Sequence, residues 1–414
     1  MPDPAPAEVV HATCAVAGGG PAGAMLGFLL ARAGVRVVVL EKHGDFLRDF
    51  RGDTIHPSTL EVMHELGLID DFLRRPHEEA RRLTGVVGGA EVTVADFTRL
   101  PTRCKFLAFM PQWDFLDFLT ARARRYPGFD LRMRADVTDL IEDRGRVVGV
   151  RAATPGGPLE VRADLVVGAD GRGSVVRRRA GLAIRDLGAP MDVLWMRLSR
   201  RPTDPDQPGG RFDRGRILVM IFRGDYWQCG YVIPKGGYDE IRRRGLDAFR
   251  AEIAAVAPFV HDRVGELASW DDVKLLTVTV NRLKRWWRPG LLCIGDAAHA
   301  MSPVGGVGIN LAIQDAVAAA NLLAAPLLAG TVTAGDLRNV QRRRELPARL
   351  TQWVQVQIQN RVINRVIAGP RRPLAPPLPV RLLRRFPFLS RIPARLVGIG
   401  FRPEHVRTAA AGEG

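Results

Sequence analysis

Apolar residues form both short and long runs in the first forty positions of the chain. Residues 13–17 and 35–41 are short runs of the kind that form buried strands, and residues 22–33 form a longer run that fits a helix ending at Gly34. The turn GGGPAG separates the first strand from this helix. A strand, a tight glycine turn, a helix and a second strand in this order predict a Rossmann-like α/β unit.

The pattern continues further along the chain. Helical spacing recurs at residues 58–66 and 113–124, alternation typical of a sheet covers 84–110, and strand patterns return at 147–150 and 159–170. We therefore expect the α/β domain to extend well beyond its first unit.

The pattern changes character at residues 186–280. Short apolar and aromatic runs separated by glycine or proline predict a mainly antiparallel sheet there, with one helix at 239–255. A helical pattern then fills about 335–367. The predicted fold class is α/β: a Rossmann-like nucleotide-binding domain with an inserted, mainly antiparallel β-sheet substrate domain and a helical C-terminal tail. The predicted boundaries are 1–80, 101–185 and 277–350 for the discontinuous nucleotide-binding domain, 81–100 and 186–276 for the β-sheet domain, and 351–414 for the helical, basic C-terminal segment.

Length and composition narrow the class of protein. With 414 residues, 46% of them hydrophobic and 25% charged, the chain can bury two or three cores, which excludes a single small binding module and general disorder. The four cysteines lie far apart with no C-x-x-C spacing, so we predict neither disulfides nor a metal site. The first residues show no export leader, which predicts a cytoplasmic location. The apolar stretch 304–329 contains Asp315 and is expected to be a buried helix.

The net charge of +16 raises the question of a nucleic-acid partner. Nearly all of the 60 basic residues are arginines, and they are spread over the whole chain, so we predict no nucleic-acid binding. Only the C-terminal stretch RLLRRFPFLSRIPARLVGIGF is dense in arginine, which alternates there with apolar residues. We expect a basic helix packed on the domain, in preference to one that contacts a membrane surface or an acidic partner.

The turn after the first strand carries the spacing G-x-G-x-x-G. Gly18 permits the tight turn, Gly20 lets a pyrophosphate approach the backbone, and Gly23 lets the helix and strand pack closely. Glu41 ends the second strand about twenty residues later, where a carboxylate can accept hydrogen bonds from ribose hydroxyls. These residues predict a dinucleotide site, and Lys42, next to Glu41, is a further candidate contact.

A second glycine-rich segment, GDAAHAMSPVGGVGINLAIQDA, covers residues 295–316. Asp296 follows an apolar strand and should emerge at the carboxyl edge of the sheet, where ligands of α/β proteins bind. The loop after it leads into a long apolar helix, and it can present backbone amides and the helix dipole to an electron-rich ring. Its candidate residues are Pro303, Gly305, Gly306 and Gly308.

With the segment VVGADGRGSVVR at 166–177, these motifs make the chain from about residue 13 to about 330 resemble the class A flavoprotein monooxygenases, the single-component aromatic hydroxylases. The resemblance implies that the nucleotide-binding domain binds FAD. The glycine turn and Glu41 would hold the ADP half, and Asp296 would meet the ribityl and pyrophosphate region. Pro303 and the amides of 305–308 would line the isoalloxazine, with Pro303 at the reacting flavin face.

The resemblance also implies roles for residues outside the three motifs. Arg51 would lie near the pyrophosphate, with Thr54 and Ile55 close to the flavin edge. Gln112 stands where relatives carry arginine or glutamine, so its phosphate contact is left open, and the backbone of Val137 would meet the adenine. Asp170 and Arg177 match the motif that the family links to both FAD and NADPH. His56 and His299 lie inside motifs, and for both we expect a packing or capping role.

The function implied by the resemblance is an FAD-dependent monooxygenase. It would use NADPH or NADH and O2 to hydroxylate an aromatic or polycyclic small molecule through a flavin hydroperoxide, without a conventional acid–base residue. The alternatives are a flavin-dependent epoxidase or reductase of an isoprenoid or lipid, and a non-catalytic FAD-binding protein. The substrate would lie between the flavin and the β-rich domain. Its candidate wall residues, about half of which should be core, are Trp195, Phe222, Tyr226, Trp227 and Tyr231. The identity of the substrate, the choice of nicotinamide and the oligomeric state stay open.

Overall fold

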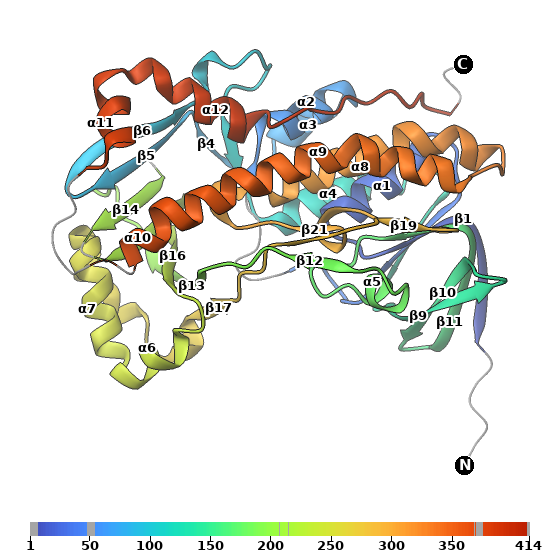
Figure 1. Cartoon of the computed structure of the whole chain (residues 1–414), viewed down its shortest axis with the longest axis horizontal. Coiled ribbons are helices and arrows are strands. Elements are labelled where there is room, and N and C mark those ends of the chain that lie inside the picture. The colour runs from blue at the N-terminus through green and yellow to red at the C-terminus, as the bar shows by residue number, and fades with distance from the viewer. Residues whose placement is uncertain are drawn as a thin grey trace.

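The computed structural model describes residues 7–47, 54–206, 208–213, 215–367, 369 and 376–411. Its central sheet is parallel through most of its width, in the order β20, β11, β1, β2, β8. Figure 1 labels β1 and β11 of this sheet, near the end of the molecule where the N-terminus lies. Strands β19, β9 and β10 extend it with antiparallel pairing. The strands are β1 (Glu8–Ala17), β2 (Val37–Glu41), β8 (Phe129–Met133), β9 (Asp136–Asp143), β10 (Arg146–Thr154), β11 (Gly157–Gly168), β19 (Trp287–Arg288) and β20 (Leu291–Cys293).

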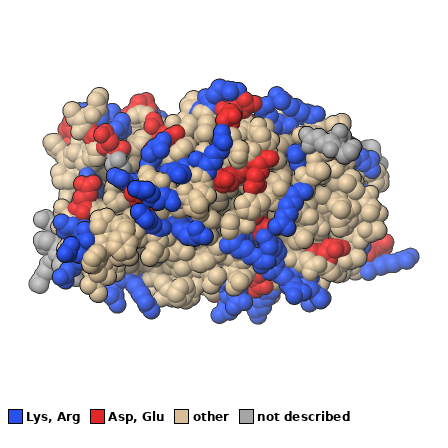
Figure 2. All heavy atoms as spheres, turned by 90° about the horizontal axis from the view of Figure 1, so that it is seen from above, with Lys and Arg blue, Asp and Glu red and all other residues tan. Residues whose placement is uncertain are grey.

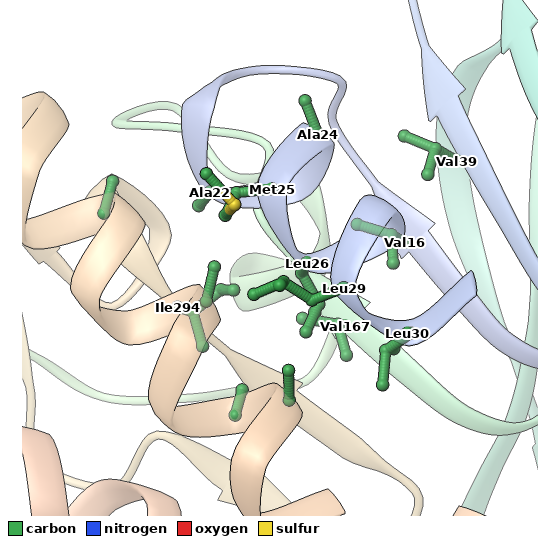
Figure 3. Close-up of a cluster of buried hydrophobic side chains, with 14 of the residues drawn as sticks. Val16, Ala22, Ala24, Met25, Leu26, Leu29, Leu30, Val39, Val167 and Ile294 are labelled. Atoms are coloured by element: carbon green, nitrogen blue, oxygen red, sulfur yellow. The ribbon is translucent and has the colours of Figure 1, made fainter. Parts of the chain in front are cut away.

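Helices cover the central sheet, and the predicted strand, turn, helix and strand open it as β1, α1 (Pro21–Arg32) and β2. Helix α1 packs against α4 (Gln112–Ala123) and α8 (Gly308–Leu328), and α8 packs in turn against α9 (Ala334–Ile358). Figure 3 shows Leu26 and Leu29 of α1 beside Val167 and Ile294, inside the largest hydrophobic core. The apolar character of both faces of α1 and α8 follows from this position between layers.

The second large sheet has the order β17, β13, β16, β15, β14, β5, β6, and every pair is antiparallel except β14 with β5. Helices α6 (Tyr238–Arg244) and α7 (Leu246–Val256) contribute side chains to the core on one of its faces. The single helix expected at 239–255 is therefore divided, because Gly245 has a φ of +87° and breaks it. The strands are β5 (Arg82–Val87), β6 (Ala90–Asp96), β13 (Met191–Ser199), β14 (Gly209–Asp213), β15 (Arg216–Arg223), β16 (Tyr226–Pro234) and β17 (Lys274–Leu276).

Two small sheets and several short helices connect these layers. One sheet joins β3 (Thr54–Ile55), β7 (Leu107–Phe109) and β4 (Glu78–Ala80), and the other joins β12 (Ile184–Asp186), β18 (Asn281–Leu283) and β21 (His299–Ala300). The short helices are α2 (Pro57–Glu65), α3 (Ile69–Leu73), α5 (Val175–Arg179) and the 3-10 turns η1 (Phe97–Arg99), η2 (Pro258–Val260), η3 (Val264–Glu266), η4 (Trp270–Asp272), η5 (Gly295–Ala297) and η6 (Val304–Gly306).

The C-terminal region packs on the end of the second sheet before its tail returns to the central sheet's helices. Helix α9 runs on through a π-helical turn (Gln359–Ile363) into α10 (Asn364–Ile367), and α11 (Leu378–Arg385), η8 (Pro387–Ser390) and α12 (Arg391–Gly398) follow. The extended tail then reaches α1, where the Ala411 N–H donates to the carbonyl of Arg32 at 2.8 Å (Figure 1). The boundary expected at 350/351 falls inside α9, whereas residues 82–96 join the sheet of 191–276. The division into domains otherwise stays a prediction.

The segment Val304–Leu328 is long and apolar enough to cross a membrane by length and composition. Most of it is buried between α1 and α9, which is also the position of a core helix.

Candidate functional site

Of the three G-x-G-x-x-G glycines between β1 and α1, Gly20 leaves room for a ligand, whereas Gly18 and Gly23 do not. A Cβ on Gly18 would lie 2.5 Å from the carbonyl oxygen of Ala169, and one on Gly23 would lie 1.9 Å from that of Gly18. At Gly20, the N-cap of α1, a Cβ would meet no atom within 4 Å, and no side chain caps the helix. Open space in front of uncapped N–H groups at a helix N-terminus fits a phosphate.

Glu41 closes one side of this turn. Its Oε2 accepts a hydrogen bond from the N–H of Gly19 at 3.0 Å, and its Oε1 accepts one from the N–H of His43 at 3.1 Å. The N–H of Ala135 donates to the carbonyl of Glu41 at 2.9 Å, which brings the segment before Val137 to this edge. Val137 itself is buried in β9, and Lys42 is exposed. The arrangement fits a ribose beside Glu41, and direct contacts of Val137 and Lys42 stay predictions.

The two later motifs meet at the same edge of the sheet. A Cβ on Gly295, which has a φ of +57°, would lie 3.1 Å from the Cβ of Ala22 in the first turn of α1. The neighbouring Asp296 accepts a hydrogen bond from Nε of Arg172 at 3.1 Å, and both side chains are about one-third exposed. Asp296 is therefore placed beside the N-terminus of α1, with its carboxylate still accessible.

Asp170 and Arg177 support this edge from behind. Asp170 lies next to Gly18 and caps α5, because its carboxylate accepts hydrogen bonds from the Ser174 hydroxyl at 2.5 Å and the Val175 N–H at 2.7 Å. Arg177 is buried, and its Nη1 donates to the carbonyl of Ala297 at 3.1 Å. Both residues thus hold the protein's own backbone. Their predicted direct contacts with FAD or NADPH stay predictions.

The loop Pro303–Gly308 passes against β3. Gly305 and Gly306 have φ values of +78° and +63°, a conformation that favours glycine. A Cβ on Gly306 would lie 3.1 Å from Oγ1 of Thr54, whereas one on Gly308 would meet no atom within 4 Å. Pro303 is half-buried at the start of η6. The loop is therefore tight against Thr54 and open at the N-terminus of α8.

His56 lies next to this loop, and its backbone N–H and one ring nitrogen are hydrogen-bonded to other parts of the chain. Burial lowers its pKa to about 4, although the carbonyl of Val397 opposes this shift, so the ring is neutral at pH 7. Its Nδ1 lies 2.7 Å from that carbonyl and must therefore carry the proton. The N–H of His56 donates to Oδ1 of Asn310 at 2.9 Å. The residue thus ties the start of α8 and helix α12 to the flavin-edge segment.

Three glutamines of α9 and the π-helical turn after it hold the other end of the loop. The Nε2 of Gln352 donates to the carbonyl of Ala300 at 3.1 Å, that of Gln355 to the carbonyls of Ser302 and Val304 at 2.9 and 2.8 Å, and that of Gln359 to Oγ of Ser302 at 2.7 Å. No role in the site was expected for these glutamines. Their spacing of three and four positions along a helical stretch was the available signal, because it places all three amides on one face.

A buried ionic network, also missed, lies behind Asp296. Asp315 accepts hydrogen bonds from the Gly295 N–H at 3.0 Å, Nε2 of His299 at 2.5 Å and Nε of Arg344 at 3.0 Å, and Glu404 pairs with Arg344 at 3.3 Å. Burial alone would raise the pKa of Asp315, but His299, Arg344 and the Gly295 N–H lower it below its usual value. The charged aspartate thus fixes the backbone of the turn that presents Asp296. An aspartate inside an otherwise apolar helix was the sequence signal for it.

Two predicted contacts are not joined to this cluster. Gln112 is the half-buried first residue of α4, and within the described ranges no hydrogen bond or ion pair links its side chain to the other site residues. Arg51 lies between residues 47 and 54, outside the described residues. Both phosphate contacts stay predictions.

The five candidate wall aromatics separate onto different sides of the second sheet. Phe222, Trp227 and Tyr231 belong to the core shared with α6 and α7, where Tyr231 donates to Glu252 at 2.7 Å. They therefore do not face the loop of residues 303–308. Tyr226 is half-exposed, with the guanidinium of Arg197 stacked 3.9 Å from its ring centre. Trp195 points to the other face and packs on the same apolar cluster as Val304 of the loop.

The residues present fit FAD. The glycine turn and Glu41 provide a phosphate and ribose cradle, and the amides of the 303–308 loop lie at the opposite end, next to the apolar face that carries Trp195. When bound, FAD supplies hydride acceptance and oxygen activation. The chain's own part is to hold and orient it. The fold and this site define an FAD-dependent oxidoreductase.

Comparison with known proteins also indicates an FAD-dependent oxidoreductase. A family model described as an FAD binding domain matches residues 11–354. The chain is 34% identical over 360 residues to 6-methylpretetramide 4-monooxygenase of Streptomyces rimosus, covering 86% of each chain. The chain belongs to this FAD-binding family, and it is an FAD-dependent monooxygenase, which confirms the predicted fold class, cofactor and enzyme type. Several further relatives are longer, and the chain spans about 60% of their length.

Two solved structures resemble the chain throughout. The OxyS anhydrotetracycline hydroxylase from Streptomyces rimosus has a TM-score of 0.71 and 27% identity, and the match covers 94% of this chain and 76% of that one. The structure of pqsL, a probable FAD-dependent monooxygenase from Pseudomonas aeruginosa, has a TM-score of 0.74 and covers 87% of this chain and 99% of that one. At 23% identity, the second likeness shows the fold alone.

Proposed function

We propose that this chain hydroxylates a polycyclic phenolic small molecule, at the expense of O2 and NADPH or NADH. In balance, one oxygen atom is inserted into a ring C–H bond to give C–OH, and the other leaves as water with the hydride from the nicotinamide and one proton from solvent. The names of the similar monooxygenase and hydroxylase from Streptomyces rimosus support a substrate of this class. The cytoplasm remains the location that the sequence predicts.

The observation that carries the proposal is the apolar cluster shared by the loop and the second sheet. It contains Val193, Trp195 and Val232 of the sheet together with Val304 of the loop. A Cβ on Gly230 would lie 3.1 Å from Cη2 and Cζ3 of Trp195, so the absence of a side chain at this glycine makes room for the indole ring. An apolar face with a broad ring, next to the loop at the flavin edge, suits the flat surface of fused aromatic rings. It also keeps water from the reacting carbon.

A substrate panel tests the proposal. Purified, flavin-loaded protein is mixed with NADPH or NADH and with simple phenols, fused-ring phenols and isoprenoids, while NAD(P)H, O2 and product mass are followed. We expect nicotinamide oxidation to be stimulated by a fused-ring phenol, with a product 16 mass units heavier, the gain of one oxygen atom. Nicotinamide oxidation with no oxygen gained by any compound would favour a reductase, and oxygen gained only by isoprenoids would favour an epoxidase.

Two tryptophan variants locate the substrate. Trp195→Ala should raise KM for the fused-ring substrate about tenfold or more, because a buried aromatic contact worth about 1.5 kcal/mol is lost. Trp353→Ala is the matched control, since this side chain is 63% exposed on α9, and it should leave KM unchanged. Equal KM values for wild type and both variants would place the substrate elsewhere.

A further inference from the structure

Helices α11 and α12, with η8 between them, expose more apolar surface than their packing requires. We call this surface the C-terminal face. Leu378, Phe388 and Ile392 are 65%, 61% and 60% exposed, and they lie within one short segment, where exposed apolar residues that gather are more informative than single ones. The exposed large apolar residues of the face are Leu378, Leu382, Phe386, Phe388 and Ile392.

The inner side of the same segment is already packed. Ala394 is fully buried, and a Cβ on Gly398 would lie 2.7 Å from Cδ1 of Leu100, so α12 sits closely on the end of the second sheet. The carbonyl of Val397 is also held by His56. Because the inner side of α12 is already packed, the apolar residues on its outer side do not belong to the core of this chain.

The charge on the C-terminal face has one sign. Its exposed arginines are Arg381, Arg384, Arg385, Arg391 and Arg395. The sequence contains no Asp or Glu from residue 346 to 403. Among the described residues, none of these five guanidinium groups forms an ion pair or a hydrogen bond. Figure 2 looks onto the molecule from the side on which α11 and α12 lie in Figure 1, and shows Lys and Arg side chains spread over that side.

We propose that the C-terminal face binds the surface of an anionic lipid membrane. Helices that lie in a membrane interface combine exposed Leu and Phe with arginines, and they bury the apolar side chains at the headgroup boundary while the basic groups meet lipid phosphates. Arginine can do both, because its stem lies along apolar surface and its guanidinium reaches the phosphate. This inference does not depend on the proposed function.

The charge and shape of the C-terminal face favour a membrane surface over a second copy of this chain or an acidic protein. A second copy of the chain would bring arginines against arginines in a two-fold contact, which is repulsive. An acidic protein would satisfy the arginines, but it would also need pockets for apolar side chains that lie on two short helices and the turn between them. A fluid interface accepts such side chains wherever they project.

Vesicle sedimentation with the full-length, FAD-loaded protein tests the inference. The vesicles contain either phosphatidylcholine alone or phosphatidylcholine with phosphatidylglycerol at about three to one. We expect binding to the anionic vesicles that falls as salt is added, and little binding to the neutral ones. Each basic residue near an anionic surface contributes about fivefold in partitioning, so Arg384→Ser/Arg385→Ser should lower it roughly 30-fold. Phe386→Ser/Phe388→Ser should also lower the partitioning, and by about the same factor at high salt as at low salt.

The matched control is Arg242→Ser/Arg243→Ser. These arginines occupy the last turn of another short helix, α6, so the control removes the same charge from elsewhere on the molecule. It should bind vesicles within about twofold of wild type. Circular dichroism and FAD content of each variant show whether it is folded.

Three outcomes would overturn the inference. Wild-type protein that fails to sediment with anionic vesicles would do so, as would an equal loss of binding in the control and the Arg384/Arg385 variant. Light scattering that shows a dimer which the Phe386/Phe388 variant dissociates, together with no vesicle binding, would instead make the face a contact between copies of this chain.

Discussion

Replacing the buried Asp315 with asparagine should be one of the most damaging conservative changes in this chain. Asp315 is fully buried and accepts hydrogen bonds from His299, Arg344 and the Gly295 N–H. Removing one partner of a buried ion pair costs about 3–5 kcal/mol, because the other charge stays buried without compensation. Asparagine retains one acceptor for the Gly295 N–H, so we expect the free energy of unfolding to fall by about 3 kcal/mol, near the low end of that range.

The measurement is urea unfolding of the FAD-free protein at pH 7. Asp225→Asn is the control, because this carboxylate is 85% exposed and lies 3.8 Å from Arg197, so its loss should change the unfolding free energy by less than about 0.5 kcal/mol. In Asp315→Asn/Arg344→Met no guanidinium is left buried beside residue 315, and Glu404 keeps Arg343 at 2.7 Å. The double variant should therefore lose less than the sum of the two single variants.

The same network sets a pH dependence. The pKa of Asp315 is lowered in the folded protein, so its contribution is complete above the unfolded value of about 3.9 and is lost as pH falls through the lower folded value. Wild-type protein should thus lose more stability than Asp315→Asn between pH 5 and acid unfolding. An Asp315→Asn variant that unfolds within about 1 kcal/mol of wild type, with the same acid profile, would refute this reasoning.

Three further expectations concern cofactor binding. Gly23→Ala should destabilise the FAD-free protein, since its Cβ would lie 1.9 Å from the Gly18 carbonyl. Gly20→Ala, at a φ of −67° and with open space around its Cβ, should leave the melting temperature unchanged and still weaken FAD binding. Unaltered FAD affinity in Gly20→Ala would place the phosphates elsewhere. Asp296→Ala should raise the dissociation constant of FAD at least tenfold in a fluorescence titration, because a charge-assisted hydrogen bond worth about 1.5–3 kcal/mol is lost, and an unchanged constant would contradict the assignment. Gly306→Val is strained at a φ of +63° and 3.1 Å from Thr54, so anaerobic reduction by NAD(P)H in rapid mixing should slow at least tenfold, about 1.4 kcal/mol of barrier, and a wild-type rate would count against the loop's role.

The local parts of this protein were readable from the sequence. The turn at Gly18–Gly23, the strand end at Glu41 and the glycines before α8 lie where the pattern predicts them, because each depends on backbone geometry within a few residues. The break at Gly245 went unpredicted for a related reason. Apolar periodicity continues across it, and only the backbone conformation of that one glycine separates α6 from α7.

Tertiary structure decided which distant residues support the site. Arg344 reaches Asp315 from 29 residues away, and Glu404 pairs with Arg344 from 60 residues away. The glutamines of α9 and its π-helical turn hold a loop more than 50 residues earlier. The sequence shows that these side chains are polar, but not which groups of the chain they satisfy. The same limit applied to the aromatics of the second sheet. Alternation predicts that strand residues face opposite sides, and only the packing of α7 on one side and the 303–308 loop on the other decides that Tyr231 is core and Trp195 is not.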